Sequence, residues 1–266
     1  MLAELEAVYV LSLASDTDRR SHIRAHFSDV GIEKYAFVNA ATPESKSVKD
    51  LYRTGFVQGF PNCFRCKKES CACPNNILIP QQIANWVSFM AIWRKISTMT
   101  GPVLICEDDV YFYSGARDVL ERIKPALLNV LNGGEALIRL GQSGNPLQPS
   151  QPLGTSALLT AKPYMSNVAH IITPSYARRL LHELKRIDCT SDVWAHKIVP
   201  SMRKSYCVSV EPLLATDLSY NPTHARFKSN IHPKGISASD NQRSAAHIKR
   251  VDSKTEYDRL FQEWIG

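Results

Sequence analysis

The fold is decided by VLICEDDVYF, residues 103–112. The apolar start of this stretch is typical of a buried strand, and three consecutive carboxylates follow it, Glu107, Asp108 and Asp109. Acids this close together repel one another and are costly to hold near a core unless a cation neutralises them. Mg²⁺ and Mn²⁺ prefer oxygen ligands and commonly take one or two carboxylates together with substrate phosphates. The stretch therefore predicts a site for a divalent metal and a nucleotide diphosphate, with a solvated acidic turn as the alternative.

Around this stretch, strand-like and helix-like patterns alternate along the chain. We expect strands over residues 7–13, 35–40, 102–107 and 136–140. We expect helices from Ser15 to Gly31, from Pro80 to about Met99, over roughly 115–131, from Thr173 and Pro174 to about Arg186, and after Ser253. Such alternation predicts an α/β fold with a mainly parallel central sheet covered on both faces. Ligands bind at the carboxyl ends of the strands in such sheets, which is where the three acids lie.

Length and composition are those of an ordinary globular protein. The chain has 266 residues, of which 44% are hydrophobic and 21% charged, which is enough for a substantial core. We expect a single domain over residues 1–266, with a cysteine-rich insertion at 60–76, a long loop at 141–163 and a basic C-terminal segment at 221–266. No apolar run approaches the roughly 20 residues that cross a bilayer, and the acidic start lacks the layout of a signal peptide. We therefore expect a cytosolic protein.

The chain is basic, and its basic residues gather late in the sequence. The net charge is +7, from 32 basic and 25 acidic residues, which favours anionic partners without identifying them. No aromatic-and-basic RNA-binding signature accompanies the charge, so nucleic acid is the weaker choice of partner. The basic C-terminal segment fits a peripheral contact with the inner face of a membrane as well as it fits a solvated surface.

Four of the seven cysteines fall close together, with the spacing C-x2-C-x4-C-x-C. They are Cys63, Cys66, Cys71 and Cys73. In a cytosolic chain such a cluster favours a structural Zn²⁺ with four sulfur ligands. Two disulfides are the rival interpretation if the protein is exported, and free thiols are the other alternative. A site with four protein ligands has no open position, so it would staple the insertion and do no chemistry.

The order of motifs along the chain resembles that of a known enzyme family. The features that carry the resemblance are the strand at 8–13 with Asp18-Arg19-Arg20 after it, the strand at 35–40, a helix with Ser88 and Trp93, the Glu-Asp-Asp triplet, LIRLG at 137–141, the segment 170–181 and Ser191-Asp192-Val193-Trp194. This succession, over about residues 7–235, resembles glycosyltransferase family 25, which includes lipooligosaccharide and collagen galactosyltransferases. One departure is that the family often has Ser-His in the middle helix, where this chain has Ser88-Phe89.

The resemblance implies a GT-A-like, Rossmann-type glycosyltransferase fold and a metal-dependent transfer from a nucleotide sugar. In resembling enzymes the acidic triplet holds the metal, so we assign Glu107 and Asp109 to Mn²⁺ or Mg²⁺, and His232 as a further candidate ligand. Asp108 is expected to contact the ribose or a nearby backbone group. The remaining candidates for nucleotide binding are Leu13, Arg19, Arg20, Asn39, Lys228 and Lys234. Guanidinium groups suit phosphate oxygens, and the sequence does not distinguish Arg19 from Arg20.

Members of the family invert the anomeric centre, which implies a single displacement with one general base. Asp192 is the candidate, because it occupies the position of the family's late aspartate. An aspartate in a first helical turn often only caps the helix, so Asp188 and Asp217 remain substitutes. Trp194, next to this position, is a candidate for bordering the acceptor.

The sequence thus predicts an inverting hexosyltransferase that uses a UDP-sugar, with UDP-galactose or a relative as donor. The resemblance implies a glycan or lipid-linked glycan as acceptor, such as lipooligosaccharide or surface polysaccharide. Two alternatives stay open: a zinc-containing nucleic-acid-binding module, and a degenerate relative of the family without activity.

Overall fold

The strand that carries the acidic triplet lies inside a mixed, mostly parallel sheet of seven strands. A computed structural model of the chain describes residues 1–73, 76–144, 153, 156–202, 205–219, 226–229, 231 and 250–266. The sheet has the strand order β2-β1-β3-β7-β5-β8-β6. Its strands are β1 (Ala7–Ser12), β2 (Ala36–Asn39), β3 (Val103–Glu107), β5 (Ala136–Arg139), β6 (Leu158–Thr160), β7 (Ala169–Ile172) and β8 (Tyr206–Glu211). A separate two-stranded sheet pairs β4 (Val110–Phe112) with β9 (Ala215–Asp217).

Two strands run against the rest of the sheet. β1 pairs in parallel with β2 and β3, and β5 pairs in parallel with β8. β7 is antiparallel to both β3 and β5, and β6 is antiparallel to β8. The expected α/β class and the mainly parallel sheet are confirmed, although the reversal of β7 was not expected. The carboxyl ends of β1, β3, β5 and β8 therefore share one edge of the sheet.

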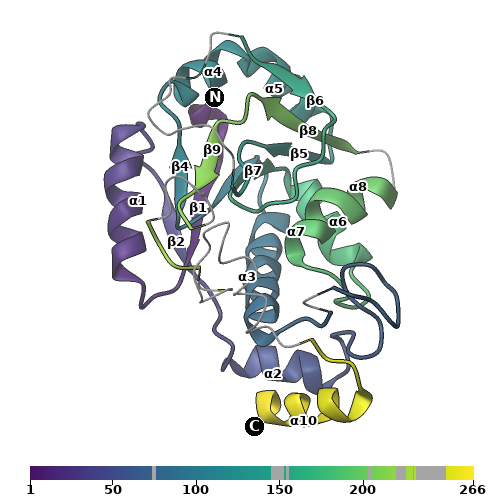
Figure 1. The fold of residues 1–266 in the computed structure, drawn as a ribbon. Coiled ribbons are helices and arrows are strands. Elements are labelled where there is room, and N and C mark those ends of the chain that lie inside the picture. Colours follow the sequence, from purple (N-terminus) through teal and green to yellow (C-terminus); the bar gives the residue numbers. More distant parts are fainter. Residues whose placement is uncertain are drawn as a thin grey trace.

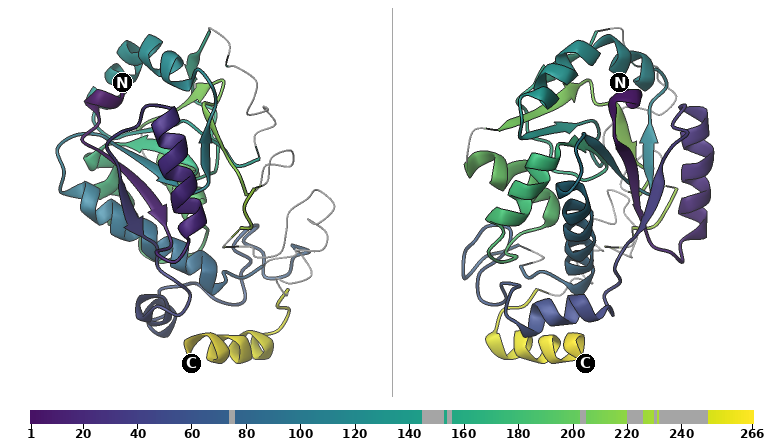
Figure 2. Two further views of the ribbon diagram at one scale, coloured as in Figure 1. Left: turned by 90° about the vertical axis from the view of Figure 1, so that its left-hand side faces the viewer. Right: turned by 180° about the vertical axis from the view of Figure 1, so that it is seen from behind.

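Alternate side chains of the central strands face two hydrophobic cores, as the period of two in a strand requires. On one face Tyr9 of β1, Ile105 of β3 and Ile172 of β7 pack against α3 (Pro80–Ser97) and α6 (Pro174–Glu183). On the other face Val10 and Leu104 pack against α1 (Thr17–Asp29), α4 (Ala116–Arg122) and α5 (Lys124–Asn132). The views from the front, the side and behind show these helices on opposite faces of the sheet (Figures 1 and 2). A sheet buried on both faces is why its strands read as continuous apolar runs.

Several expected helices begin or end differently in the structure. α1 is capped by Asp16, whose carboxylate accepts a hydrogen bond from the Arg19 N–H at 3.2 Å, and not by Ser15. Its end is as predicted, because Gly31 adopts φ +73° just after the C-cap. The helix expected over 115–131 is divided, with α4 ending at Arg122 and α5 starting at Lys124 ahead of a proline. Proline fits the first turn of a new helix and cannot continue an old one.

Other elements had no prediction. They are η1 (Leu2–Glu4), α2 (Lys46–Arg53), the π-helical turn η2 (Trp194–Ile198), α8 (Val199–Met202), and the strands β4, β6, β7, β8 and β9. α7 (Ser191–Val193) agrees with the helix start expected at Asp192. β6 lies within the expected long loop, which is wrong over Leu158–Thr160. None of the described helices is long and apolar enough to cross a bilayer.

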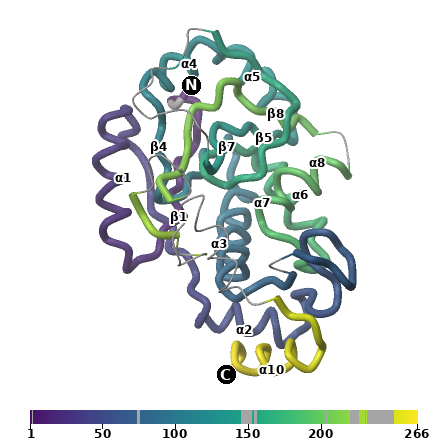
Figure 3. Tube along the Cα trace, viewed as in Figure 1, coloured from purple at the N-terminus to yellow at the C-terminus, as the bar shows by residue number. Residues whose placement is uncertain are grey.

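The last helix packs beside a helix from the first third of the chain. α10 (Lys254–Ile265) begins at Ser253, whose hydroxyl accepts from the Glu256 N–H at 3.2 Å as the sequence predicted. The Tyr52 ring of α2 packs edge-on against Phe261 and at a tilt against Trp264 of α10, with ring centroids 5.9 and 5.6 Å away. The tube view shows α2 and α10 together at the C-terminal end of the molecule, opposite the N-terminus (Figure 3).

Candidate functional site

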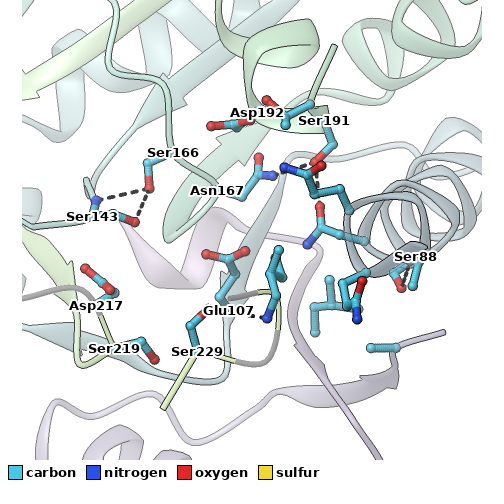
Figure 4. A pocket seen from close by; sticks show the side chains of 18 of the residues that line it. Ser88, Glu107, Ser143, Ser166, Asn167, Ser191, Asp192, Asp217, Ser219 and Ser229 are labelled. Atoms are coloured by element: carbon cyan, nitrogen blue, oxygen red, sulfur yellow. Dashed lines mark hydrogen bonds between the residues drawn. The ribbon is translucent and has the colours of Figure 1, made fainter. Parts of the chain in front are cut away.

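A cavity of about 600 Å³ opens where β1 and β3 end. Its walls come from the ends of these strands, from α3, from the start of α7 and from the segment after β9. Five carboxylates line it, namely Glu107, Asp108, Asp109, Asp192 and Asp217, against three cations, Arg19, Arg65 and Lys197. Figure 4 shows Glu107 in the middle of this cavity, with Asp217 and Ser219 to one side and Asp192, Ser191 and Asn167 to another. The acidic residues predicted from the sequence therefore face a cavity and do not form a solvated turn.

Arg19 neutralises part of the negative charge of these carboxylates. Its Nη1 lies 2.6 Å from Asp108 Oδ1 and 3.1 Å from Asp109 Oδ2, and all three side chains are buried. Its Nη2 donates to Ser219 Oγ and to the Lys228 carbonyl, each at 2.8 Å. With these partners the guanidinium has few N–H donors left for a ligand. Arg19 lines the predicted site, but its charge is paired with Asp108 and Asp109 of the protein itself.

The Asp108 side chain is buried and forms an ion pair with Arg19. Burial raises the pKa of Asp108 to about 6, even though the charge and hydrogen bond of Arg19 act in the opposite direction. Asp109 accepts a short hydrogen bond from the Ser219 hydroxyl, in addition to its ion pair with Arg19. Contact of Asp108 with a ribose stays a prediction, whereas its ion pair with Arg19 is a feature that the sequence did not indicate.

Glu107, the last residue of β3, is the acid of the cavity for which the described residues offer no partner. Among the described residues, none donates a hydrogen bond to its carboxylate or forms an ion pair with it. Burial, and then the charges of Asp109, Asp217, Asp108 and Asp192, raise the pKa of Glu107 well above its usual value. A buried carboxylate among like charges needs a proton or a cation. Glu107 is therefore the strongest candidate in the cavity for binding a divalent cation.

Asp217 and Ser219 complete the acidic side of the cavity. The β4–β9 ladder places Asp217 opposite Val110, directly after the acidic triplet. Asp217 Oδ1 accepts a hydrogen bond from the Gly144 N–H at 2.8 Å. We call Glu107, Asp108, Asp109 and Asp217 the acid cluster. The carboxylate oxygens of this cluster are not gathered tightly enough to form a set of three ligands, since within the described ranges only the cysteines meet that condition.

Asp192 lies across the cavity, at the start of α7. Burial raises the pKa of Asp192, while hydrogen bonds from Thr190 and from the Val193 backbone, and then the charge of Arg65, lower it. A raised pKa suits a group that takes up a proton near neutral pH. Of the two substitutes, Asp217 also lines the cavity, whereas Asp188 does not and pairs with Lys67 at 3.3 Å and Arg186 at 3.9 Å.

A chain of buried polar groups supports the wall below Asp192. Ser191 donates to Asn85 Oδ1 at 2.6 Å and accepts from Asn167 Nδ2 at 3.0 Å. Asn167 Oδ1 lies 3.2 Å from Nε2 of His196, whose ring packs edge-on against His170. Burial lowers the pKa of both histidines, that of His170 to about 3, so they are neutral at ordinary pH. Asn85, Ser191 and Asn167 line the cavity. Ser191 belongs to a quoted motif but had no predicted role, and no motif marked Asn85 or Asn167.

The other predicted nucleotide-binding residues separate into two groups. Leu13 lines the cavity. Arg20 does not; its Nη2 donates to Asn39 Oδ1 at 2.6 Å, and its guanidinium lies 4.8 Å from the Phe37 ring centroid. Arg20 and Asn39 thus join α1 to β2 beside the cavity. The Lys228 side chain is exposed and does not line the cavity, although its carbonyl accepts from Arg19. His232 and Lys234 lie outside the described residues.

The departure from the Ser-His pattern has a simple structural basis. Ser88 lines the cavity, donating to the Ala84 carbonyl and accepting from the Ala41 N–H at 2.9 Å. Phe89 is fully buried in the core.

Trp194 was expected to border the acceptor, but it does not line the cavity. Its side chain is buried, and its Nε1 donates to the Leu180 carbonyl.

The four cysteines of the insertion form a compact cluster beside the cavity. Their sulfurs all lie within 4.8 Å of one another, and each thiol is free. Four sulfurs about 2.3 Å from a tetrahedral zinc ion lie about 3.8 Å apart, so this spacing fits such an ion. Burial alone would raise the pKa of Cys63, but N–H donors from Cys66 and Arg65 and thiol hydrogen bonds lower it to about 7. A thiol that ionises readily favours metal binding.

Comparison with protein families identifies a match over most of the chain. The model of glycosyltransferase family 25, described as an LPS biosynthesis protein, matches residues 5–195. This range includes β1, α3, the Glu107–Asp109 triplet and Asp192, and therefore most of the cavity wall. No curated protein matches the chain.

Proposed function

We propose, because the chain belongs to glycosyltransferase family 25, that it transfers a hexose from a UDP-sugar to a glycan in the synthesis of lipopolysaccharide or a related surface polymer. The carboxylate of Glu107, which has no partner among the described residues, is the observation that carries the proposal, since it places an acid that needs a proton or a cation in a cavity of about 600 Å³. A cavity of this size suits a nucleotide sugar. The mostly parallel sheet and the position of the cavity at its edge are compatible with a GT-A-like domain that includes the cysteine insertion.

The acid cluster suits a divalent cation that arrives with its substrate. Glu107 and Asp109 are the proposed ligands, with Asp217 close by, and the remaining positions fall to phosphate oxygens and water. Within the described residues the acid cluster forms no compact set of three ligands, which agrees with this division. When bound, Mn²⁺ or Mg²⁺ would offset the charge that develops on the departing diphosphate. The protein's own residues supply the acceptor side of the reaction.

Asp192 is the proposed general base. The acceptor hydroxyl oxygen forms a bond to the anomeric carbon from the face opposite the diphosphate, and its proton passes to the Asp192 carboxylate. The bond between the anomeric carbon and the diphosphate oxygen breaks, and its electron pair leaves with UDP. Such a single displacement inverts the anomeric centre. The position of Asp192 across the cavity from Glu107 supports these separate roles.

The cysteine cluster is proposed to hold a structural Zn²⁺. Its four sulfurs already occupy one small volume, and a site with four protein ligands leaves no position for substrate. Elemental analysis of the purified protein is expected to give one zinc per chain. Its absence after purification in zinc-containing buffer would contradict this assignment.

The direct test of the function is the release of UDP when the protein is mixed with Mn²⁺ and each of several UDP-sugars. One sugar is expected to give release above background. Asp192→Asn is expected to keep Mn²⁺ and UDP binding but to lower transfer to an acceptor by about 10²–10⁴-fold, the usual contribution of a general base. Absence of release with every UDP-sugar tried would favour an inactive relative of the family.

A further inference from the structure

The insertion that carries the cysteines also contributes directly to the cavity wall. Phe64 and Arg65, the two residues between Cys63 and Cys66, both line the cavity. The guanidinium of Arg65 lies 5.4 Å from the Phe64 ring centroid, and the Phe64 ring is partly buried against the core. A purely structural role for the metal would not explain why this loop places a positively charged side chain in the wall of the cavity.

Backbone geometry ties the position of Arg65 to the sulfurs. The Arg65 N–H donates to Cys63 Sγ at 3.4 Å, and the Lys67 N–H donates to the Cys63 carbonyl at 2.8 Å. Lys67 adopts φ +62°, which costs a non-glycine residue free energy and is kept only where the surroundings enforce it. This turn brings both sulfurs of the C-x2-C pair to one side and Arg65 to the cavity.

The insertion is fastened to the segment that carries Asp192. Val57 forms an isolated parallel bridge with Ile187, and the Gln58 N–H donates to the Ile187 carbonyl at 2.7 Å. Lys67 pairs with Asp188 at 3.3 Å and also donates a short hydrogen bond to its carbonyl. The loop beyond α2 accordingly lies beside α6 and α7 (Figure 1). The conformation of the insertion is therefore coupled to that of the cavity wall around Asp192.

The cations of the cavity differ in what they have left to bind. Arg19 is occupied by Asp108, Asp109, Ser219 and the Lys228 carbonyl. Arg65 and Lys197 line the cavity on the side of Asp192, and neither forms a salt bridge within the part of the chain that the structure describes. Arg65 is close enough to Asp192 for its charge to be felt there. A guanidinium group can bind two oxygens of a phosphate or carboxylate through two parallel N–H···O hydrogen bonds.

We propose that the cysteine cluster, loaded with zinc, fixes Arg65 as the residue that recognises an anionic group, phosphate or carboxylate, on the acceptor glycan, with Lys197 contributing. The proposal rests on the proposed function for the assignment of the Asp192 side to the acceptor. It adds that the acceptor carries a negative charge close to the hydroxyl that reacts. It also adds that the zinc ion affects acceptor binding and takes no part in the transfer step.

Binding of small anionic sugars tests this directly and does not require turnover. With UDP and Mn²⁺ present to fill the donor side, affinities for glucose 6-phosphate, glucuronate and uncharged glucose are measured by calorimetry or saturation-transfer NMR. We expect the parent protein to prefer at least one charged sugar by about tenfold or more, the usual scale of a charge-assisted pair. The two charged sugars separate phosphate from carboxylate recognition.

Matched variants distinguish Arg65 from the general positive charge of the loop. Arg65→Gln is expected to abolish the preference, and Arg65→Lys to keep part of it. Lys68→Gln is the control, because Lys68 lies in the same loop, is exposed and does not line the cavity. Cys71→Ser is expected to lose zinc and the preference together, while UDP binding stays within twofold of the parent.

Several results would overturn the proposal. They are equal affinity for charged and uncharged sugars, a preference that survives in Arg65→Gln or in zinc-free Cys71→Ser, or a preference that is seen only when UDP is left out, which would make Arg65 a donor residue. Failure of the proposed function would be seen separately, as no UDP binding and no UDP release with Mn²⁺ in the parent protein.

Discussion

Two groups of side chains in this molecule are candidates for metal binding, and their geometry differs. The four cysteines of residues 63–73 hold their sulfurs within 4.8 Å of one another. In the acid cluster, two of the carboxylates, those of Asp108 and Asp109, are instead paired with Arg19, and Glu107 has no described partner. The first arrangement could supply all four ligands of a metal ion, whereas the second does not offer three ligand atoms close together within the described residues. The difference fits the proposal of a structural zinc ion at the cysteines and a cation that binds with the substrate at the acid cluster.

The internal cation of the acid cluster should matter most for stability. Arg19→Gln leaves Asp108 and Asp109 buried without their positive partner, and breaking such a pair typically costs about 3–5 kcal/mol. Arg20→Gln is the matched control, because Arg20 is less buried and donates to exposed Asn39, and a partner pair of this kind contributes about 0–1 kcal/mol. Urea denaturation measures both. Equal losses in the two variants would contradict the role given to Arg19.

Glu107→Gln should separate activity from stability within the acid cluster. Removing the charge is expected to lower kcat by about 10²–10³-fold, the scale found for groups that stabilise developing charge. The free energy of unfolding should not fall, because the buried like-charge repulsion is relieved. Exposed Glu33→Gln is the control for the change of residue type. Parental activity in Glu107→Gln would remove the main support for the metal assignment.

The cysteine cluster should respond in the opposite way. Cys71→Ser is expected to lose zinc and to make residues 60–76 about tenfold more sensitive to limited proteolysis, with the rest of the chain unchanged. A short treatment with EDTA is expected to remove the activating divalent cation while the zinc stays bound, since a site with four thiolates binds zinc tightly. If EDTA removed both metals at the same rate, the distinction between the two sites would fail.

The smallest expected effect is on the pH dependence of stability. The pKa of Glu107 is raised above 4.5 in the folded protein, so the folded state keeps this proton to a higher pH than the unfolded chain. Stability contributed by the protonated form is present below about pH 4.5 and is lost as the pH rises toward the folded pKa. The difference in stability between Glu107→Gln and the parent should therefore grow from pH 4.5 upward. A constant difference across this range would show that Glu107 is not buried as described.

Sequence patterns predicted the strands and helices that carry long apolar repeats, but not the elements fixed by distant contacts. β1, β3, α3 and α6 were all expected close to their observed positions. β7 reverses direction because it pairs with β3 and β5, which come from other parts of the chain. β4 and β9 are three residues each and exist only through pairing with each other. No local pattern records such pairings.

The same limit applies to the candidate site. The acidic triplet was found because three carboxylates directly follow an apolar strand, whereas Asp192 was found because its motif resembles a family that matches residues 5–195. Arg19 could not be told from Arg20, because adjacent helix positions point about 100° apart and only packing decides which one is buried. Arg65 lacked any signal in the sequence, since its place in the cavity depends on the turn that the cysteines make.

Mn²⁺ binding measured by electron paramagnetic resonance is the direct test of whether the acid cluster holds a divalent cation together with the donor diphosphate. We expect the parent protein to bind one Mn²⁺ more tightly with UDP than without it. We expect Glu107→Gln to weaken this binding by at least tenfold at unchanged zinc content. Mn²⁺ affinity that is the same in Glu107→Gln and the parent, or that is indifferent to UDP, would contradict the proposed binding.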